Sequence, residues 1–359
     1  MNEPIFIARQ DTLEQEILPA HWLAQYKLFG EESYTFQDKG IWKKLCMSSA
    51  AANDRDIHAE ALEEMLTTFS AEHTGKWMLL VYGMDAAALE GLATMAAIAA
   101  NGTAMGAIVD NALLMHAIAN SETAMQRIAN SQTAMQRVAN NRGAMDAIGR
   151  SRIARDAVQA SPYYNSYIKE NDMAIAKLVV GFANLESAGY SGMAGVAADS
   201  TAMTAVAASS TAMTAVAASG VALKAIAQAY KNTANMLQFL KAVNASDTLI
   251  KRIYTTLTNA TALFGASQLG AQDGVESANS WATTSAAPNA FLACACGYYS
   301  SGGSSVNVTY NGTVIAQNKT GAKQPGSVTS TNVNAITMAP STFTENGDGW
   351  LAVQKFTAK

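Results

Sequence analysis

Charge and cysteine are both scarce in this sequence of 359 residues. Charged side chains make up 14% of it, against about a quarter of an average soluble chain. Its three cysteines, Cys46, Cys294 and Cys296, are too few for a disulfide scaffold. We expect Cys294 and Cys296, two apart in an apolar stretch, to be small buried side chains on one face of a strand. A redox or metal role for this pair is the alternative.

The sequence also lacks a basic patch. Its net charge is -4, and pairs such as Lys43-Lys44 and Lys251-Arg252 are typical of ordinary solvated surfaces. A surface that neutralises phosphates needs clustered Lys and Arg. We therefore expect no nucleic-acid partner.

Signals for export and membrane insertion are missing too. The N-terminus has no basic region followed by an apolar core, so it does not resemble a secretion signal. Residues 91–109 and 200–223 carry no charge, but they are rich in Ala, Gly, Ser and Thr and continue a pattern found in charged segments. We expect no membrane insertion.

Chemistry-bearing motifs are absent as well. The four histidines show no metal-ligand spacing, no GxSxG elbow occurs, and no glycine run continues into Lys-Ser or Lys-Thr. We therefore expect no enzyme, with no catalytic residue, no cofactor and no metal site. The histidines are His21, His58, His73 and His116.

Residues 1–85 are of ordinary complexity, with apolar residues at helical spacing, and predict a helical attachment domain. From about residue 91 the sequence repeats every ten residues, as in SETAMQRIAN and SQTAMQRVAN. Each copy carries Met, with Arg155 in its place in the last copy of the first block, and Ile or Val three residues later. The predicted repeat core is Met105, Ile108, Met115, Ile118, Met125, Ile128, Met135, Val138, Met145, Ile148, Met203, Val206, Met213 and Val216.

A ten-residue period favours one short helix per copy. Ten residues advance an ideal helix by about 1000°, roughly 80° short of three turns, so a single long helix would spiral its apolar stripe around itself. A turn must reset each helix. Ser121, Ser131 and Ser151 stand where N-caps are needed, and Asn120, Asn130 and Asn140 stand at the junctions, where we expect turn conformations.

One such repeat cannot fold alone. Burying one Met and one Ile gains roughly 3–6 kcal/mol, whereas ordering ten residues costs on the order of 10–20 kcal/mol. Stacked copies can cover one another. We therefore predict a decapeptide-repeat region of short stacked helices over residues 86–230, interrupted at 161–192.

The rest of the chain changes character twice. Residues 231–262 predict amphipathic helices, which would cap the repeats or bundle with another subunit. Residues 263–359 are rich in Gly, Ser, Thr and Asn and contain strand-like runs, with Asn311-Gly312 as a strong hairpin signal. They predict a β-sandwich-like domain. The expected fold class is multidomain α+β.

Aromatic clusters are the candidate recognition residues. Tyr163, Tyr164 and Tyr167 lie in SPYYNSYI, and Tyr298 and Tyr299 precede a Ser/Gly-rich loop. Each group is consistent with binding a sugar or docking a partner. A packed corner for the first group and a plain hairpin loop for the second are the alternatives.

The repeats SETAMQRIANSQTAMQRVAN and DSTAMTAVAASSTAMTAVAAS resemble the Ala-Met-Ser/Thr decapeptides of tailed-bacteriophage structural proteins, of the tail-fibre and baseplate type. The segment NAFLACACGYYSSGGSSVNVTYNGTVIAQN resembles small β-domains on such proteins. The resemblance covers residues 90–359. It implies a virion protein made in the host cytoplasm, with other virion proteins as partners. It also implies homo-oligomers, among which trimers are common in fibres, and contact with the host cell surface.

Three other functions fit the sequence. A head-associated capsid fibre, collar or decoration protein is the nearest alternative. A bacterial surface adhesin would need an export signal, and a tail-associated lysin would need the catalytic motifs that were not found.

Overall fold

The computed structural model places a defined part of the chain, which falls into two compact units. Unit 1 is Met1–Tyr164 and unit 2 is Asn165–Lys359. Most of the predicted attachment domain, and several loops of the β-rich part, lie outside the described residues. The described residues are 79, 84, 86–92, 94–229, 231–269, 280–283, 290–298, 305–320, 322–323, 328–339, 341–346 and 351–359.

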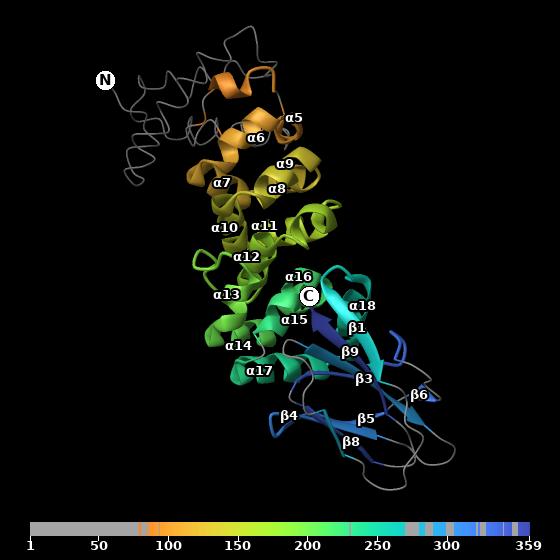
Figure 1. Ribbon diagram of the computed structural model, residues 1–359. Helices are drawn as coiled ribbons and strands as arrows, with labels where there is room; N and C mark the ends of the chain where they lie inside the picture. The colour runs from red at the N-terminus through yellow and green to blue at the C-terminus, as the bar shows by residue number, and fades with distance from the viewer. Residues whose placement is uncertain are drawn as a thin grey trace, which may run out of the picture. The chain divides into compact units, whose positions relative to one another are not determined.

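Unit 1 is a series of short helices (Figure 1). From α6 onward each helix begins ten residues after the previous one, as the repeat requires. The helices are η2 (Ala86–Leu89, a 3-10 helix), α5 (Met95–Ala100), α6 (Gly102–Val109), α7 (Ala112–Ala119), α8 (Glu122–Ala129), α9 (Gln132–Ala139), α10 (Arg142–Arg150) and α11 (Arg152–Ala160).

Each repeat begins with a capping side chain in extended backbone. The predicted caps Ser121, Ser131 and Ser151 are confirmed: each hydroxyl oxygen accepts a hydrogen bond from the backbone N–H three residues later. Asn111 and Asn141 do the same with their side-chain oxygens. The cap satisfies a donor that the first helical turn leaves free, so a helix can restart at every tenth residue.

The helices end in turns at Asn120 and Asn140, as expected. Asn120 and Asn140 have φ of -97° and -96°, so neither adopts the left-handed conformation that Asn tolerates. Instead, the Asn120 amide donates to the carbonyl oxygen of His116 at 2.9 Å, and Asn140 donates to that of Gln136 at 2.9 Å. A side-chain donor thus satisfies a carbonyl that the last turn leaves free.

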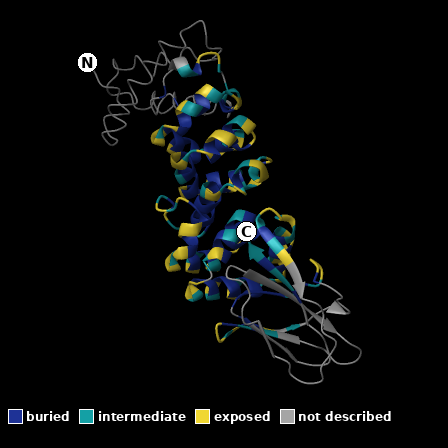
Figure 2. Cartoon of the chain, in the orientation of Figure 1, coloured by how far each residue is buried: buried dark blue, intermediate teal, exposed yellow. Residues whose placement is uncertain are grey.

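The core of unit 1 uses four positions of each repeat. In α8 these are Ala124, Met125, Ile128 and Ala129, all buried. All fourteen side chains expected in the repeat core, in both units, are at most 1% exposed. Figure 2 shows these buried positions on the inner sides of the helices, with the exposed ones outside.

In unit 1, helices stack on the third helix further along the chain. The chain bends by 101° between α6 and α7. Three bends of this size make most of a full turn, and each helix packs on the helix three places later. The pairs are α5 with α8, α6 with α9, α7 with α10, and α8 with α11. One coil of this solenoid is three helices, or thirty residues.

Unit 2 continues with helices and then strands. The π-helix η3 (Tyr164–Ile168) lies at the boundary of the two units. The helices of unit 2 are α12 (Asp172–Phe182), α13 (Met193–Ala198), α14 (Ser200–Ala208), α15 (Ser210–Ala218), α16 (Gly220–Gln228), α17 (Thr233–Asn244) and α18 (Asp247–Asn259). Helices stack on the third helix further along the chain here as well, in the pairs α12–α15, α13–α16, α14–α17 and α15–α18.

The interval 161–192 is not wholly irregular, because it contains α12. Asn171 caps this helix ten residues after Ser161, and Ile175 and Leu178 take the buried places of Met and Ile/Val. The irregular part is the loop between α12 and α13.

The loop after α12 shifts the register of the ten-residue repeat, so that later helices no longer begin at the same position in each ten residues as before. Helix α13 has no capping side chain of its own at Gly192. The Asp172 carboxylate accepts from the Met193 N–H at 2.9 Å instead. A Cβ on Gly192 would collide with this carboxylate, so the close approach requires glycine.

The described strands form two sheets at the C-terminal end of unit 2. One has the order β1-β9-β3-β6, with β7 also paired to β3, and the other has the order β2-β8-β4-β5. Every pair is antiparallel except β3–β6. The strands are β1 (Phe264–Leu269), β2 (Ser280–Thr283), β3 (Ala290–Tyr298), β4 (Ser305–Tyr310), β5 (Thr313–Thr320), β6 (Ala322–Lys323), β7 (Ala335–Met338), β8 (Ser341–Asn346) and β9 (Leu351–Ala358).

The predicted hairpin at Asn311-Gly312 is confirmed. Tyr310 pairs with Thr313, so the loop between β4 and β5 has two residues. Asn311 and Gly312 have φ of +47° and +77°, the combination that a two-residue hairpin turn needs at both central positions.

Helices and sheets are packed together within unit 2. Helix α17 contacts β5 and β7, α18 contacts β1 and β7, and α16 contacts β3 and β9. The ring of Tyr254 on α18 meets that of Phe356 on β9 edge to face, with 5.8 Å between centroids. The helices of residues 231–262 thus stack on earlier repeats with one side and carry strands on another.

Candidate functional surfaces

The capping serines also join one coil of the solenoid to the next. Ser131 Oγ donates to the carbonyl oxygen of Ala99 at 2.6 Å, Ser151 to Ala119 at 2.5 Å, and Ser161 to Ala129 at 2.5 Å. Each acceptor lies 32 residues back, at or next to the last residue of the helix that packs against the helix just before the serine. One hydroxyl therefore closes the end of one helix and opens another.

Unit 2 repeats this arrangement with adjusted spacing. Ser209 Oγ donates to the carbonyl oxygen of Phe182 at 2.9 Å, across 27 residues. Its oxygen also accepts from the Ala212 N–H at 3.2 Å. Here the acceptor is the last residue of α12, on which the capped helix α15 itself stacks, whereas in unit 1 it lies on the partner of the helix before the serine.

Arg155 occupies the core place that Met fills in the six preceding repeats. It is 7% exposed, and its Nη1 donates to the carbonyl oxygen of Gly149 at 2.6 Å. Burial lowers the pKa of this guanidinium from its usual range. The Met series of unit 1 therefore ends on a cation that is held by a backbone carbonyl.

Lys177 on α12 is fully buried. Its ammonium group donates to the carbonyl oxygen of Ser187 at 2.7 Å, and it lies 3.4 Å from that of Ala188. It therefore fixes the loop that shifts the phase of the repeats.

A second pair of polar groups lies where this shifted series resumes. Tyr190 OH donates to Asp199, the N-cap of α14, at 2.8 Å. Burial and this hydrogen bond raise the pKa of Tyr190 to about 12. Hydrogen bonds from the Ala202 N–H and from Tyr190 lower the pKa of Asp199. The pair is thus fixed as a neutral phenol and a carboxylate at neutral pH.

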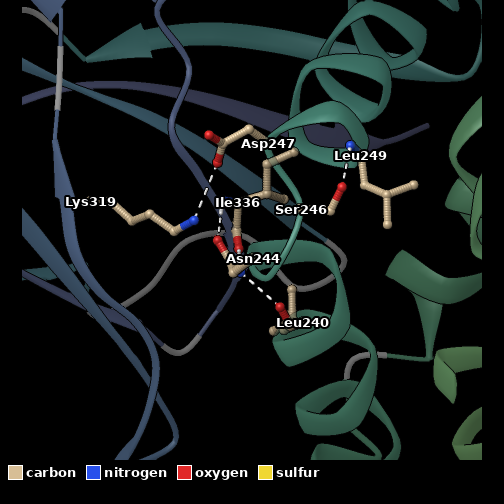
Figure 3. A network of polar contacts seen from close by, with 7 residues as sticks. All are labelled: Leu240, Asn244, Ser246, Asp247, Leu249, Lys319 and Ile336. Atoms are coloured by element: carbon tan, nitrogen blue, oxygen red, sulfur yellow. Dashed lines mark hydrogen bonds and ion pairs between the residues drawn. The ribbon is translucent and has the colours of Figure 1, made fainter. Parts of the chain in front are cut away.

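Asn244 joins the helices of unit 2 to the sheets. Its amide nitrogen donates to the carbonyl oxygens of Leu240 at 2.8 Å and Ile336 at 2.7 Å. Its amide oxygen accepts from the Ile336 N–H at 3.1 Å. Figure 3 shows this pairing between the end of α17 and strand β7. The side chain acts toward Ile336 as a neighbouring strand would.

Two further contacts secure the same junction. Lys319 on β5 pairs with Asp247 on α18 at 3.3 Å (Figure 3). Tyr254 OH lies 2.6 Å from both the Val328 carbonyl oxygen and Gln354 Oε1. Burial raises the pKa of Tyr254. The fixed helix–sheet junction was missed by the sequence reasoning, because its partners lie 72 to 100 residues apart.

The predicted recognition tyrosines do not form one site. Tyr163, Tyr164 and Tyr167 lie in and beside η3, and all are partly exposed. Tyr298 is the last residue of β3, and Tyr299 lies outside the described residues. Recognition by either group stays a prediction.

Two other predictions concern Cys294, Cys296 and the histidines. Both cysteines lie on β3, where they pair with Val353 and Leu351, but nothing described places their side chains. His116 is exposed on α7, with its Nε2 3.3 Å from the Asn120 amide. Cys46 and the other three histidines lie outside the described residues. Within the described residues, no cluster of three His, Cys, Asp or Glu side chains could hold a metal ion.

Among the described residues, no single helix is long and apolar enough to cross a membrane. Two pairs reach the required length and composition only when joined across a 101° bend, α6 with α7 and α14 with α15.

Family models and curated proteins give no relative from which a role could be transferred. No protein-family model matches the chain. No curated protein matches it either. The features that bear on the function are therefore the repeated coil, the helix–sheet junction and the surfaces that they carry.

Proposed function

We propose that the protein is a structural component of a bacteriophage virion, of the tail, baseplate or fibre, that acts in assembly or host attachment. The observation that carries this proposal is the decapeptide solenoid, in which the buried core positions and the stacking on the third helix along recur from coil to coil. Such a body is suited to act as a spacer, because its length is set by the number of repeats.

The side chains inside the repeats support a structural role over a chemical one. The core positions are Ala, Met, Ile and Val, and the polar groups beside them bond to backbone atoms of neighbouring helices. A core of this kind holds the backbone in place. It offers substrates no convergent set of reactive groups.

The C-terminal part would supply the contacts of this spacer. We propose that residues 263–359 form a β-sandwich-like domain from the two sheets, and that it contacts the host surface or a neighbouring virion protein. The junction at Asn244 and Tyr254 supports these separate roles of spacer and contact domain, because it would fix the position of the strands relative to the last helices.

Particle composition tests the proposal. Phage particles from a culture that produces the chain would be purified on a density gradient, and an antibody against the chain, coupled to gold, would be imaged on them. Labelling of the tail or its tip is the expected result. Labelling of the head would favour a capsid fibre, collar or decoration protein, and absence from particles would refute a virion role.

Oligomeric state and cell binding refine the same proposal. We expect light scattering of the purified full chain to show a homo-oligomer, with a trimer as the arrangement that suits a fibre. Binding of that oligomer to host cells would support attachment. A monomer that ignores cells would limit the role to assembly.

A further inference from the structure

A groove in unit 2 gathers cations from two separate segments. It has a volume of about 870 Å³ and lies between α18 and the turn before α12. Lys251 and Arg252 line it from α18, and Lys169 lines it from the turn. The sequence predicts Lys251-Arg252 to be an ordinary surface pair, but the fold places a third cation across from it.

The one carboxylate among the residues that line the groove, Glu170, is outnumbered by the three cations and is engaged by the protein's own donors. Glu170 accepts from the Gly220 N–H at 3.1 Å and from the Val221 N–H at 3.0 Å, and it lies 3.9 Å from Lys169. Lys251 and Arg252 are exposed and form no ion pair with a described residue. The groove is therefore electropositive, although the whole chain has a net charge of -4.

Neutral acceptors lie beside these cations. Thr255 Oγ1 donates to the Lys251 carbonyl oxygen at 2.9 Å, and Thr256 Oγ1 donates to that of Ala217 at 2.8 Å. Both hydroxyl protons are thus used within the protein, and the oxygens keep lone pairs that can accept from a ligand. Asn259, one turn after Thr255 on α18, adds an amide that can both donate and accept.

We propose that this groove binds a sugar chain that carries carboxylate or phosphate groups. The cations match the anionic groups of such a ligand, and the threonine oxygens match its hydroxyl donors. Ala260, Ala262 and Leu263 provide an apolar wall for the C–H face of a sugar ring. An acidic peptide would also satisfy the cations, but it offers one backbone N–H per residue as a donor, whereas each sugar ring offers several hydroxyl donors together with a C–H face for the apolar wall.

A ligand of this kind deepens the proposed attachment role, on which its biological meaning rests. Acidic sugar polymers are a chemistry that cell surfaces present, and a virion protein would meet them there. Binding by the purified chain is nevertheless measurable without any particle. If the chain binds the polymer but is absent from virions, the proposed function is refuted while sugar binding at the groove is still supported.

Calorimetry on the full chain tests the groove. The probes are polygalacturonate oligomers and a phosphorylated mannan, compared with neutral galactan and mannan of equal length, with poly-glutamate and with inorganic phosphate. We expect one or both acidic sugars to bind more tightly than the neutral polymers, poly-glutamate and phosphate. Failure of both acidic sugars to bind, or equal binding of poly-glutamate, would overturn the proposal.

Matched variants locate the binding. Lys251→Gln/Arg252→Gln removes two cations from the groove, and we expect Kd to rise about tenfold or more through loss of charge-assisted hydrogen bonds. Lys224→Gln/Lys241→Gln removes the same charge from residues that do not line the groove, and Kd should change by less than about twofold. Equal effects of the two pairs would mean that only net charge matters, and would contradict a site at the groove.

A third variant tests the hydroxyl contacts separately from charge. Thr255→Val/Thr256→Val should weaken binding of the acidic sugar more than binding of poly-glutamate, because the sugar has more hydroxyl donors for the threonine oxygens. Circular dichroism of every variant reports folding. Since Lys251 and Arg252 are exposed, their substitution should leave the melting curve unchanged.

Discussion

The repeats of unit 1 and the strands of unit 2 are held together over very different distances along the chain. A repeat helix is capped within three residues and packs on a helix thirty residues away. In the sheets, Phe264 pairs with Ala358, and Ala290 pairs with Thr357. The repeats are therefore locally specified and mutually replaceable, whereas each strand pairs with particular strands that have no substitute.

This difference teaches where a change should be tolerated. Removal of a repeat leaves neighbours that carry the same caps and core positions, so a new stacking pair can form. Removal of a group at the helix–sheet junction leaves a buried partner that nothing else can satisfy.

Deletions give the largest expected effect. Deletion of residues 121–125 removes Ser121 and Met125 and breaks the period, and it should lower the free energy of unfolding by on the order of 5 kcal/mol. Deletion of residues 121–130 joins Asn120 to Ser131 and keeps every remaining repeat intact. Chemical unfolding should show at most about half of that loss. Equal losses would disprove the view that repeats are replaceable.

Asn244 tests the junction against a matched residue in the repeats. Asn244→Ala should cost about 2–4 kcal/mol, because it leaves the Ile336 N–H and C=O buried without their partner. Asn120→Ala removes a similar bond to a carbonyl four residues back, but at an exposed site, and should cost at most about 0.5 kcal/mol. Urea unfolding measures both. Hydrogen exchange at the Ile336 amide should accelerate only in the first variant.

Two serine caps separate the helix cap from the bridge between coils. Ser121→Ala removes a cap and should cost about 1 kcal/mol. Ser131→Ala removes a cap and the bond to Ala99, so we expect about 1 kcal/mol more. Thermal unfolding compares the two variants. If their losses are the same, the hydroxyl bridge contributes nothing to stacking.

Glycine gives the smallest effects, of opposite sign in the two regions. Gly312→Ala places a side chain at φ +77° and should cost about 1 kcal/mol. Gly143→Ala, in the first turn of α10, meets only an ordinary contact at 3.5 Å and should stabilise the chain by about 0.5 kcal/mol. A cost at both positions would mean that Gly143 has a packing role beyond the helix.

Features that depend on a few neighbouring residues could be predicted from the sequence. The caps at Ser121, Ser131 and Ser151 follow from hydroxyl chemistry at a helix start. The hairpin follows from Asn311-Gly312, because few other dipeptides adopt two positive φ angles. The helical and strand-rich parts follow from the change in composition near residue 263.

Other features could not be predicted because they depend on how the elements turn in space. The period shows that each helix must restart, but it does not give the bend, so the stacking of every third helix was not foreseen. Helix α12 was missed because Ile175 and Leu178 replace the expected Met and Ile/Val. Its cap at Asn171, ten residues after Ser161, was the available signal. The groove needs Lys169 and Lys251 on neighbouring segments, which only the fold provides.

The three-helix coil has a consequence for how such chains can change in length. Each repeat turns the path of the chain through roughly a third of a revolution. Adding or losing one repeat therefore changes the direction in which the following part of the chain points. Changes in steps of three lengthen or shorten the body while keeping its downstream side pointed in the same direction. Natural variation in repeat number should therefore favour multiples of thirty residues wherever orientation matters, and single-repeat changes wherever a new orientation is useful.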